Sequence, residues 1–374
     1  MVLVEIREVR TMAQLKEFIK FPLKLYKDCE YYVPSLISDD LDTLRKDKNP
    51  AFEHCDAIYF MAYKGGKAVG RIGGIINRLE NDIWEKKSCR FTHVDFIDDE
   101  DVSSALFSAV EKWGREHGLN EIHGPLGFTD FDREGLLVEG FDRMATLATI
   151  YNYPYYPKHL ERLGYIKSVD WIEYLLNLKK EPQTNLDRLA GMVLKRGKFS
   201  VRKINSRKEL LPYIYEVFNL LNECYQPLYG FVPLNEGQIE KYVAMYINIV
   251  NLDYITLIDD REGKLCAFGV AMPSMSKAVQ KAKGRLLPTG IFKILKAMKN
   301  HDMVDLYLIA VRPDVQKMGV NAIIMNEILK GCLKNGVTRA ESNPELETNS
   351  DVLNQWKYFE TEQHKRRRCY KKDI

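Results

Sequence analysis

A glycine-containing turn between an apolar run and an amphipathic run has the residue types of an anion-binding site. The turn, Gln316 to Gly319, follows the apolar run 306–311 and precedes apolar residues at helical spacing from Val320. Where the amides of a turn open a helix, their unpaired N–H groups and the helix dipole favour negative charge. Gly319 lets the backbone approach a ligand closely, and Lys317 adds a positive charge. These residues predict a phosphate site; the alternative is a helix start that uses a small residue for packing.

An earlier strand-to-helix junction has the opposite charge. Residues 98–101 are Asp-Asp-Glu-Asp at the expected start of a helix. Carboxylates there cap a helix well. They would also repel a phosphate by about 1 kcal/mol per pair at 4 Å even in bulk water, and by more where water is scarce. We therefore expect the phosphate site in the second half of the chain and a structural role for the first half.

A basic segment lies in the second half, before the apolar run 306–311. Residues 276–301 contain no acidic side chain and seven basic ones: Lys277, Lys281, Lys283, Arg285, Lys293, Lys296 and Lys299. A solvated helix face is one interpretation of such a run. The other is a basic wall near cofactor phosphates or an anionic acceptor.

The elements that would position these residues occur in the same order twice. Each half shows a helix, a hairpin, a strand, a helix, a strand, a helix and a strand, with hairpin turns at Gly65-Gly66 and Gly263. Charged residues, Pro182 and Asn185 interrupt the apolar pattern between the halves. The pattern predicts an α+β chain of two domains, 1–182 and 183–374, related as a diverged tandem repeat. Two unrelated α/β domains are the alternative.

The composition limits the function classes. The 374 residues are 45% hydrophobic and 29% charged, and the formal net charge of +3 does not by itself imply a nucleic-acid partner. Seven cysteines form no C-x-x-C pair, and seven histidines are dispersed, so we predict thiols and no metal site. No apolar run is long enough to span a bilayer, and the charged N-terminus is unlike a signal peptide. We expect a cytoplasmic protein.

Several stretches resemble a known family. The sequence VRPDVQKMGVNA, 311–322, is similar to the pyrophosphate-binding turn of the GNAT acyltransferases, Q/R-x-x-G-x-G/A, with Asn321 in place of the last small residue. GPLGFTDFDREGLLVEGFD and YNYPYYPKHLERLGY in the first half, and YGFVPL and ESNPELETN in the second, resemble a group of tandem GNAT-like proteins. The resemblance implies two tandem GNAT-like domains. In each, helices flank a central, mostly antiparallel mixed sheet whose fourth and fifth strands splay apart.

The resemblance also implies a site for acyl-CoA, with acetyl-CoA as the first expectation. The acyl arm would lie between the splayed strands, and a backbone N–H of the fourth strand would stabilise the carbonyl oxygen. Asn349 would contact the pantetheine arm or cap a helix. The cofactor-binding residues expected from the resemblance are Leu308, Ile309, Val311, Gln316, Lys317, Met318, Gly319, Val320, Asn321 and Asn349.

The catalytic candidates are acids near the end of the fifth strand. Glu341 ends that strand and Glu347 lies in the following loop, so either could take a proton from an amine, directly or through water. The alternative is that both are solvated loop carboxylates. The family's tyrosine acid, seven residues after Asn349, is replaced by Trp356. Tyr358 or Tyr370 would substitute, or water would supply the proton, or catalysis is lost.

An aromatic loop is the candidate acceptor pocket. NECYQPLYGFVPLNE, 222–236, is interrupted by proline and glycine, and we predict that Tyr225, Tyr229 and Phe231 bind the acceptor. The alternative is a loop packed under the core. The segment 127–142 could close over the site from the first half.

These features predict an acyl-CoA-dependent N-acyltransferase, with acetyl as the first expected group, acting on the amine of a small molecule or peptide. The protein would be a monomer or homodimer and would use no metal. A non-catalytic acyl-CoA-binding module of the same fold is the alternative. Nucleic-acid binding through the basic segment 364–372 is less well supported, because its alternation suits a terminal edge strand.

Overall fold

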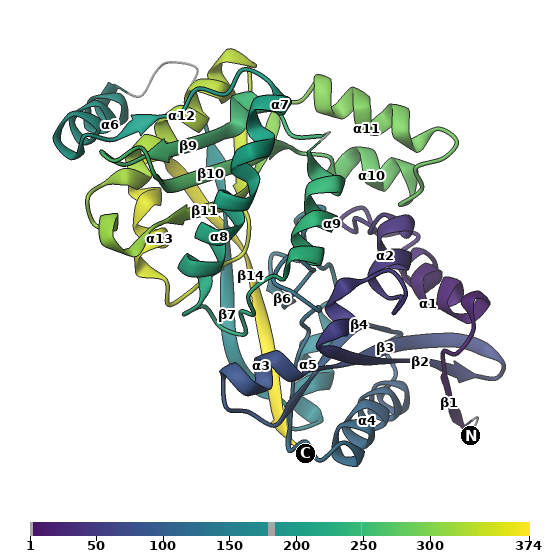
Figure 1. Cartoon of the computed structure of the whole chain (residues 1–374). Coiled ribbons are helices and arrows are strands. Elements are labelled where there is room, and N and C mark those ends of the chain that lie inside the picture. The colour runs from purple at the N-terminus through teal and green to yellow at the C-terminus, as the bar shows by residue number, and fades with distance from the viewer. Residues whose placement is uncertain (1–2, 179–183, 248) are drawn as a thin grey trace. The chain divides into compact units, whose positions relative to one another are not determined.

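The computed structural model describes residues 3–178, 184–247 and 249–374, which form two compact units (Figure 1). Unit 1 contains Met1–Ile172, Met275–Leu295 and Lys365–Ile374, and unit 2 contains Glu173–Ser274 and Lys296–His364. The predicted domain boundary between residues 182 and 183 lies outside the described residues. Each unit is therefore assembled from segments that are far apart in the sequence.

The sheet of unit 1 is mostly antiparallel. Its strands follow the order β1-β2-β3-β4-β5-β14, and β6 pairs with β14. Their bounds are β1 Val4–Glu8, β2 Cys55–Lys64, β3 Lys67–Asn77, β4 Ser88–Phe96, β5 Glu121–Gly124, β6 Leu136–Glu139 and β14 Glu360–Asp373. The parallel pair is β4 with β5, with a register from Ser88↔Glu121 to Arg90↔His123. Since β4 continues to Phe96, its second half runs on beyond this pairing.

The sheet of unit 2 repeats this plan. Its order is β7-β12-β11-β10-β9-β8, with β13 on β7. The bounds are β7 Ile166–Asn177, β8 Ser200–Val201, β9 Ile255–Asp259, β10 Leu265–Pro273, β11 Met303–Val311, β12 Arg339–Ser342 and β13 Glu345–Leu346. The parallel pair is β11 with β12, from Met303↔Arg339 to Leu306↔Ser342. In each unit the strands are mostly antiparallel and include a parallel pair, which confirms the predicted fold class, and β7 and β14 have residues in both units.

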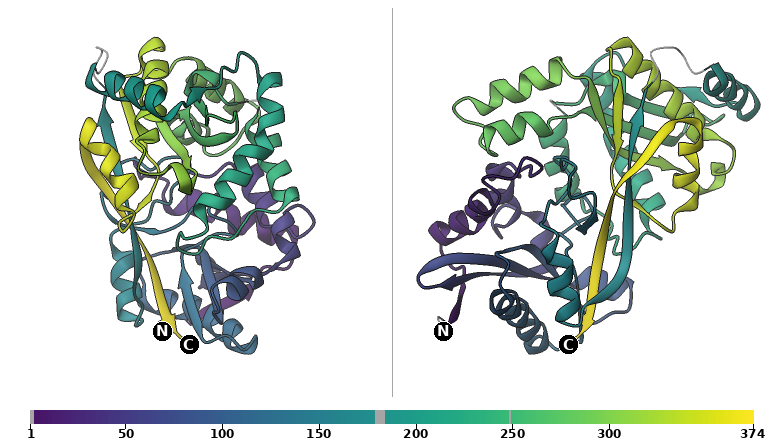
Figure 2. Two further views of the ribbon diagram at one scale, coloured as in Figure 1. Left: turned by 60° about the vertical axis from the view of Figure 1, so that its left-hand side comes forward. Right: turned by 180° about the vertical axis from the view of Figure 1, so that it is seen from behind.

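Helices flank the strands of each unit (Figures 1 and 2). In unit 1 they are α1 Met12–Leu25, α2 Ile37–Thr43, α3 Arg78–Ile83, α4 Glu100–Glu116, α5 Tyr155–Arg162 and α10 Ser276–Ala282. In unit 2 they are α6 Thr184–Gly197, α7 Arg207–Leu210, α8 Ile214–Tyr225, α9 Glu236–Tyr246, α12 Val320–Lys334 and α13 Ser350–Leu353. The helix α11, Gly290–Lys299, contributes residues to both units. No helix among the described residues is long and apolar enough to cross a membrane.

Apolar residues at helical spacing account for the helix packing. In α4, Val102, Leu106 and Val110 are fully buried and belong to one core cluster with strand residues of unit 1. In α12, Val320, Ile323 and Ile324 are likewise buried, in the core of unit 2. Each helix thus covers its own sheet with an apolar stripe. These two helices are the ones that begin at the junctions singled out in the sequence.

Candidate functional site

The strands β11 and β12 separate after Leu306, which confirms the predicted splay. Asn343, directly after β12, donates from its backbone to Leu306 O at 3.1 Å and from its side chain to Tyr307 O at 3.2 Å. On the other side, β11 stays paired with β10 as far as Ala267↔Val311, with a register shift opposite Tyr307. Residues 308–311 therefore have one edge on β10 and one edge beyond the pairing with β12.

Hydrogen bonds show which backbone groups of β11 face that second edge. The Arg312 amide donates to Cys266 O of β10. The backbone N–H and C=O of Val311 therefore point away from β10, and by alternation those of Ile309 do too. The carbonyls of these residues accept from side chains there: Ile309 O from the Tyr225 hydroxyl at 3.2 Å, and Val311 O from Gln316 Nε2 at 3.0 Å. Because the N–H and C=O of one strand residue share a direction, the amides of Ile309 and Val311 face the same edge. Leu308 directs its amide toward β10.

The turn before α12 is built from left-handed backbone. Lys317 has φ +64°, and Gly319, the residue that caps α12, has φ +82°. Glycine has no side chain to cap the first amides, and the first turn of α12 holds no acidic residue. Residues 316–319 are exposed, with Val193 of α6 as the neighbour that a Cβ at Gly319 would meet, at 3.0 Å. The Ala322 amide donates to Gly319 O at 2.9 Å, whereas the amides of Val320 and Asn321 precede the first i−4 carbonyl of the helix, so this start can accept an anion.

The equivalent helix start in unit 1 is already capped. The Asp99 carboxylate accepts from the amides of Asp101 at 3.0 Å and Val102 at 3.3 Å. The same carboxylate pairs with Lys64 Nζ at 2.6 Å. A phosphate at this position would have to displace a charged cap that the chain itself supplies. The contrast between α4 and α12 supports the expectation that unit 2 holds the anion.

Glu341 lies in a buried cluster just before the strands separate. It pairs in register with Asp305 of β11 and with Leu175 of β7. Glu341 Oε1 is 3.3 Å from Nε2 of His364 on β14, and both side chains are almost fully buried. Glu173 of β7 completes a group whose ligand atoms all lie within 4.8 Å of one another. All three members of this cluster belong to unit 2.

Of these three residues, only Glu341 was predicted from the sequence. Glu173 lies on β7 and His364 on β14. These strands are separated from β12 in the sequence, so the two side chains come close to Glu341 only in the folded chain. One indication was present for Glu173, which is a charged residue inside the apolar strand DWIEYLLNL, 170–178, and is fully buried. A buried charge among apolar residues requires a partner. Two carboxylates and an imidazole can also ligate a metal ion, so the expectation of no metal stays a prediction.

The other acidic candidates lie in the loop after β12. Glu347 is half-buried. Glu345, which the sequence analysis did not select, accepts a hydrogen bond from Trp356 Nε1 at 2.8 Å. Burial raises the pKa of Glu345 to about 8. Trp356, in the position where the resembled family has tyrosine, is itself buried and holds this carboxyl group.

The remaining predicted residues divide between the open edge and the core. Tyr225 donates to Ile309 O, as above. Phe231 is 2% exposed and packs against the Tyr225 ring, with the two ring centroids 5.8 Å apart. Tyr229 is half-buried. Asn349 caps α13 by accepting from the Val352 amide at 3.3 Å, which matches the capping alternative. The side chain of Tyr358 lies outside the described residues.

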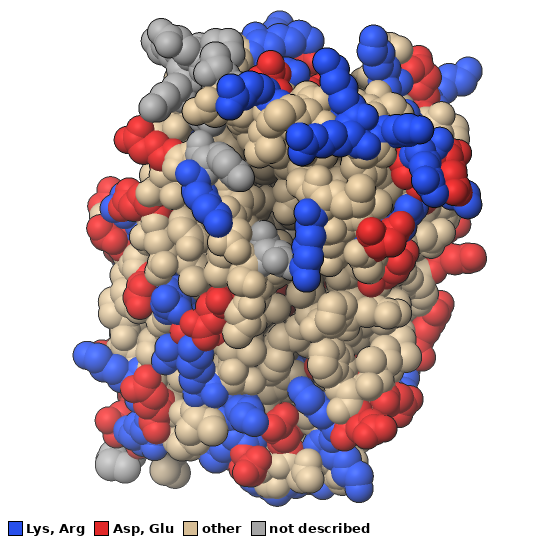
Figure 3. Space-filling view, turned by 90° about the vertical axis from the view of Figure 1, so that its left-hand side faces the viewer, with Lys and Arg blue, Asp and Glu red and all other residues tan. Residues whose placement is uncertain are grey.

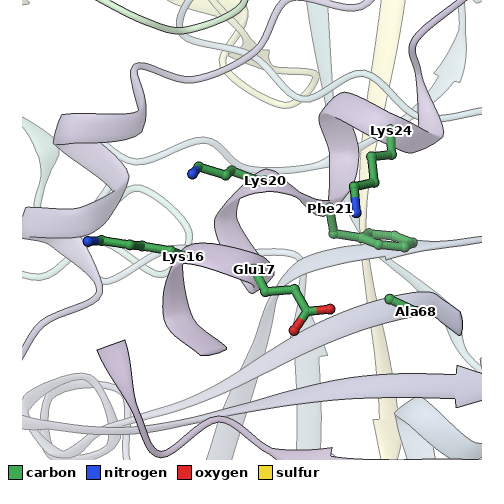
Figure 4. Close-up of a pocket in the computed structure, with 6 residues that line it drawn as sticks. All are labelled: Lys16, Glu17, Lys20, Phe21, Lys24 and Ala68. Atoms are coloured by element: carbon green, nitrogen blue, oxygen red, sulfur yellow. The ribbon is translucent and has the colours of Figure 1, made fainter. Parts of the chain in front are cut away.

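A shallow pocket in unit 1 contains none of the predicted site residues. It has a volume of roughly 190 Å³ and is lined by Lys16, Glu17, Lys20, Phe21 and Lys24 of α1 with Ala68 of β3 (Figure 4). The side chains of Lys16 and Lys20 extend in the same direction, away from Phe21. Figure 3 shows the face that carries α6 and α12, where basic side chains predominate in the upper part.

Two bacterial proteins are similar in sequence to most of this chain. No profile of a known protein family matches the chain. Protein YghO of Escherichia coli is 32% identical over 373 residues, which is 96% of this chain and 93% of that protein. A bacterial ceramide synthase of Caulobacter vibrioides is 28% identical over 295 residues, covering 78% of this chain and 75% of the synthase.

Solved structures share the fold at low sequence identity. A tandem GNAT protein from the clavulanic acid biosynthesis pathway is similar with a TM-score of 0.57 and 12% identity, over 99% of this chain and 98% of that one. A GCN5-related N-acetyltransferase from Sphaerobacter thermophilus is similar with a TM-score of 0.52 and 11% identity, over 99% and 95% of the two chains. These likenesses confirm the tandem GNAT fold that the sequence resemblance implied.

Proposed function

Because this chain belongs to the family of Escherichia coli Protein YghO and has a tandem GNAT fold, we propose that it is an acyl-CoA-dependent N-acyltransferase whose site lies in unit 2. The observation that carries the proposal is the position of the Glu341 cluster. Glu341 lies one residue before the point where β11 and β12 separate, and the amides of Ile309 and Val311 face the edge beyond that point. A base and oxyanion donors therefore lie next to one opening in the sheet.

The reaction follows from these groups. The thioester of acyl-CoA supplies an electrophilic carbonyl carbon, which the amine nitrogen of the acceptor attacks. As the C–N bond forms, the carbonyl oxygen gains negative charge and accepts hydrogen bonds from the Ile309 and Val311 amides. Glu341 takes the proton that the nitrogen loses, with His364 3.3 Å away to stabilise the protonated pair. The C–S bond then breaks, and the thiolate takes up a proton to give an amide and CoA.

Glu345 is the residue best suited to protonate the thiolate. With a pKa of about 8, its carboxyl group is largely protonated at neutral pH and can donate. Trp356 fixes one carboxyl oxygen through its indole N–H. Glu345 would then be the proton donor in place of Tyr358, which the sequence offered as one candidate. Trp356, in the position of the family's tyrosine, would hold the Glu345 carboxyl group.

The CoA phosphates are assigned to the start of α12. Glycine at position 319 leaves the first amides uncapped, the first turn holds no carboxylate, and Lys317 lies in the same turn. The three features favour a pyrophosphate by hydrogen bonding, by the helix dipole and by charge. Asn321, half-buried in the first turn, takes the position of the family's last small residue.

The acceptor is assigned to the class of long-chain amino alcohols. A ceramide is the amide of a fatty acid with such an amine, and a relative at 28% identity is a bacterial ceramide synthase. The sequence alone predicted a small-molecule or peptide amine, so the lipid amine narrows that class. Tyr225, Tyr229 and Phe231 stay candidates for the acceptor pocket, with Tyr225 next to the open edge of β11.

The direct experiment measures CoA release by the purified chain. Acyl-CoA thioesters of short and long chain are combined with a long-chain amino alcohol, a short amine and a peptide amine, and thiol formation and the amide product are followed. Amine-dependent CoA release with the long-chain amine is expected. Binding of acyl-CoA in calorimetry without turnover on any of these amines would instead support the alternative, a non-catalytic acyl-CoA-binding module, which the replacement of tyrosine by Trp356 favours.

A further inference from the structure

The basic segment of the sequence forms a helical hairpin that is anchored on one side. In α10, Val279 is fully buried, and Gln280 Nε2 donates to the carbonyls of Glu30 at 2.8 Å and Tyr32 at 2.9 Å. The carbonyl of Gly284 accepts from the Ile37 amide at 2.9 Å. In α11, Ile294 is 6% exposed. The hairpin (light green in Figures 1 and 2) thus has a fixed inner side, formed by residues up to Leu295 that belong to unit 1.

Its outer side exposes large apolar side chains. Leu287, Phe292 and Leu295 are 77%, 69% and 51% exposed, three large hydrophobic residues within nine positions. Phe292 and Leu295 are three residues apart in α11 and therefore lie on one face of the helix. Exposed aromatic and leucine side chains gathered in this way mark an interaction surface, whereas a single one would need no explanation.

Lysines surround these apolar side chains. Lys296 and Lys299 follow Phe292 at helical spacing of four and seven, on the same face of α11, and both are exposed. Exposed lysines also lie along α10, at positions 277 and 281. No acidic residue occurs anywhere between Ser274 and His301. The exposed face of α11 therefore carries apolar and basic side chains together, and the segment around it has no acidic residue.

We propose that the outer side of the α10–α11 hairpin binds the surface of an anionic lipid bilayer. Phe292, Leu295 and Leu287 would enter the headgroup region, while the lysines contact the lipid phosphates and keep their ammonium groups in water. A second copy of this chain fits less well, because two identical hairpins would bring like charges together. This docking surface contains none of the residues of the Glu341 cluster, and vesicle binding tests it without a measurement of acyl transfer.

The test is sedimentation of the full-length chain with vesicles. One set of vesicles contains phosphatidylglycerol with phosphatidylcholine, and the other contains phosphatidylcholine alone. The chain is expected to sediment with the anionic vesicles, less with the zwitterionic ones, and less at high salt, since salt screens the lysines. Equal binding to both sets, or none to the anionic set, would overturn the proposal.

Two double variants separate the apolar from the charged contribution. Phe292→Ser with Leu295→Ser should weaken binding at least about tenfold, since the apolar insertion is lost. Lys296→Gln with Lys299→Gln should weaken it roughly 30-fold, from roughly fivefold for each lysine near an anionic surface. All four side chains are exposed, so thermal melting should be unchanged, which shows that the fold is retained.

Matched controls come from other exposed positions of the chain. Ile166→Ser removes an apolar side chain that is 61% exposed at the start of β7, and Lys16→Gln with Lys20→Gln removes two exposed lysines from α1. Both controls should bind vesicles like the unchanged chain. Controls that weaken binding as much as the hairpin variants would overturn the assignment to this surface. Hairpin variants that change the oligomeric state in light scattering, with vesicle binding unchanged, would assign the surface to a second copy instead.

Discussion

Glu341 is useful as a base only if it can accept a proton in a buried place and pass it on. The Glu341→Gln substitution keeps the shape of the side chain but removes the proton acceptor, so kcat should fall by roughly 10²- to 10⁴-fold while acyl-CoA affinity is preserved. Turnover is measured by thiol release and affinity by calorimetry. Glu262→Gln, at an exposed position in the same unit, is the matched control. Full activity of the Glu341 variant would move the base role to Glu347 or to water.

Glu345 makes the stability of unit 2 depend on pH. Its pKa rises from an ordinary value of 4.5 in the unfolded chain to about 8 in the folded one. Between these values the folded chain keeps a proton that the unfolded chain releases, so the free energy of unfolding should fall as pH rises from about 4.5 toward about 8. Glu345→Gln should flatten this fall by roughly 2 kcal/mol, less than the full shift implies because the residue is only partly buried.

Denaturant unfolding at several pH values measures this effect. Glu347→Gln serves as the control, since it removes a carboxylate two positions away in the same loop. An identical pH dependence of the Glu345 variant and the unchanged chain would show that Glu345 is ionised in the folded state. The role of this carboxyl group as the acid for the thiolate would then be lost too.

The turn and α12 form the element that decides cofactor binding. Gly319→Asp places a carboxylate at the uncapped amides, where it would cap the helix, as Asp99 does in unit 1, and would repel phosphate. Acyl-CoA affinity should fall at least about tenfold in calorimetry. Because the substitution also strains a residue at φ +82°, Gly263→Asp is the control, at φ +76° in the open turn of the β9–β10 hairpin. Unchanged affinity of the Gly319 variant would exclude the turn as the phosphate site.

Local patterns allowed the prediction of this element and the family resemblance implied the splayed strands, whereas the full cluster depends on pairing between distant strands. The apolar spacing after Gly319 and the acid-free turn are visible within a few residues of sequence. Glu173 and His364 lie on strands that meet β12 only in the folded chain, and no short-range pattern connects them to Glu341. The bond between Trp356 and Glu345 is likewise a tertiary contact, so Trp356 looked in sequence like a loss of function. From the sequence, the hairpin's helices were interpreted as a solvated face or a basic wall. Only burial in the folded chain distinguishes the inner side chain of Val279 from the exposed side chain of Phe292.

The whole chain is needed to complete unit 1, because its last ten residues belong to that unit. Tyr370 to Asp373 pair with β5, and the side chains of Arg367 and Tyr370 are almost fully buried there. A chain that ends after His364 should therefore lose the melting transition of unit 1 and aggregate through the open edge of its sheet. A chain that begins at Val4 is the control, since Leu3 is 83% exposed. A truncated chain that melts like the complete one would show that β14 adds nothing to unit 1.

A fragment of residues 183–374 should fail to catalyse acyl transfer, because it lacks part of unit 2. It omits Glu173 and the part of β7 that pairs with β12 from Arg339↔Asn177 to Glu341↔Leu175. The turn at the start of α12 is still present, so a folded fragment should bind CoA while acyl transfer is lost. Calorimetry and thiol release are compared for fragment and complete chain where circular dichroism shows that the fragment is folded. Equal rates would show that Glu173 and β7 have no part in the reaction.

The pairing of β5 with the C-terminal strand also fixes when the protein can fold during its synthesis. At roughly 5–20 residues per second, the ribosome needs on the order of 10–50 s to pass from β5 to its partner residues near the C-terminus. During that time the N-terminal part of the sheet has an unpaired edge, which is the kind of surface that chaperones bind. A cell that makes this chain would therefore have to protect the nascent chain until residues 365–374 leave the ribosome.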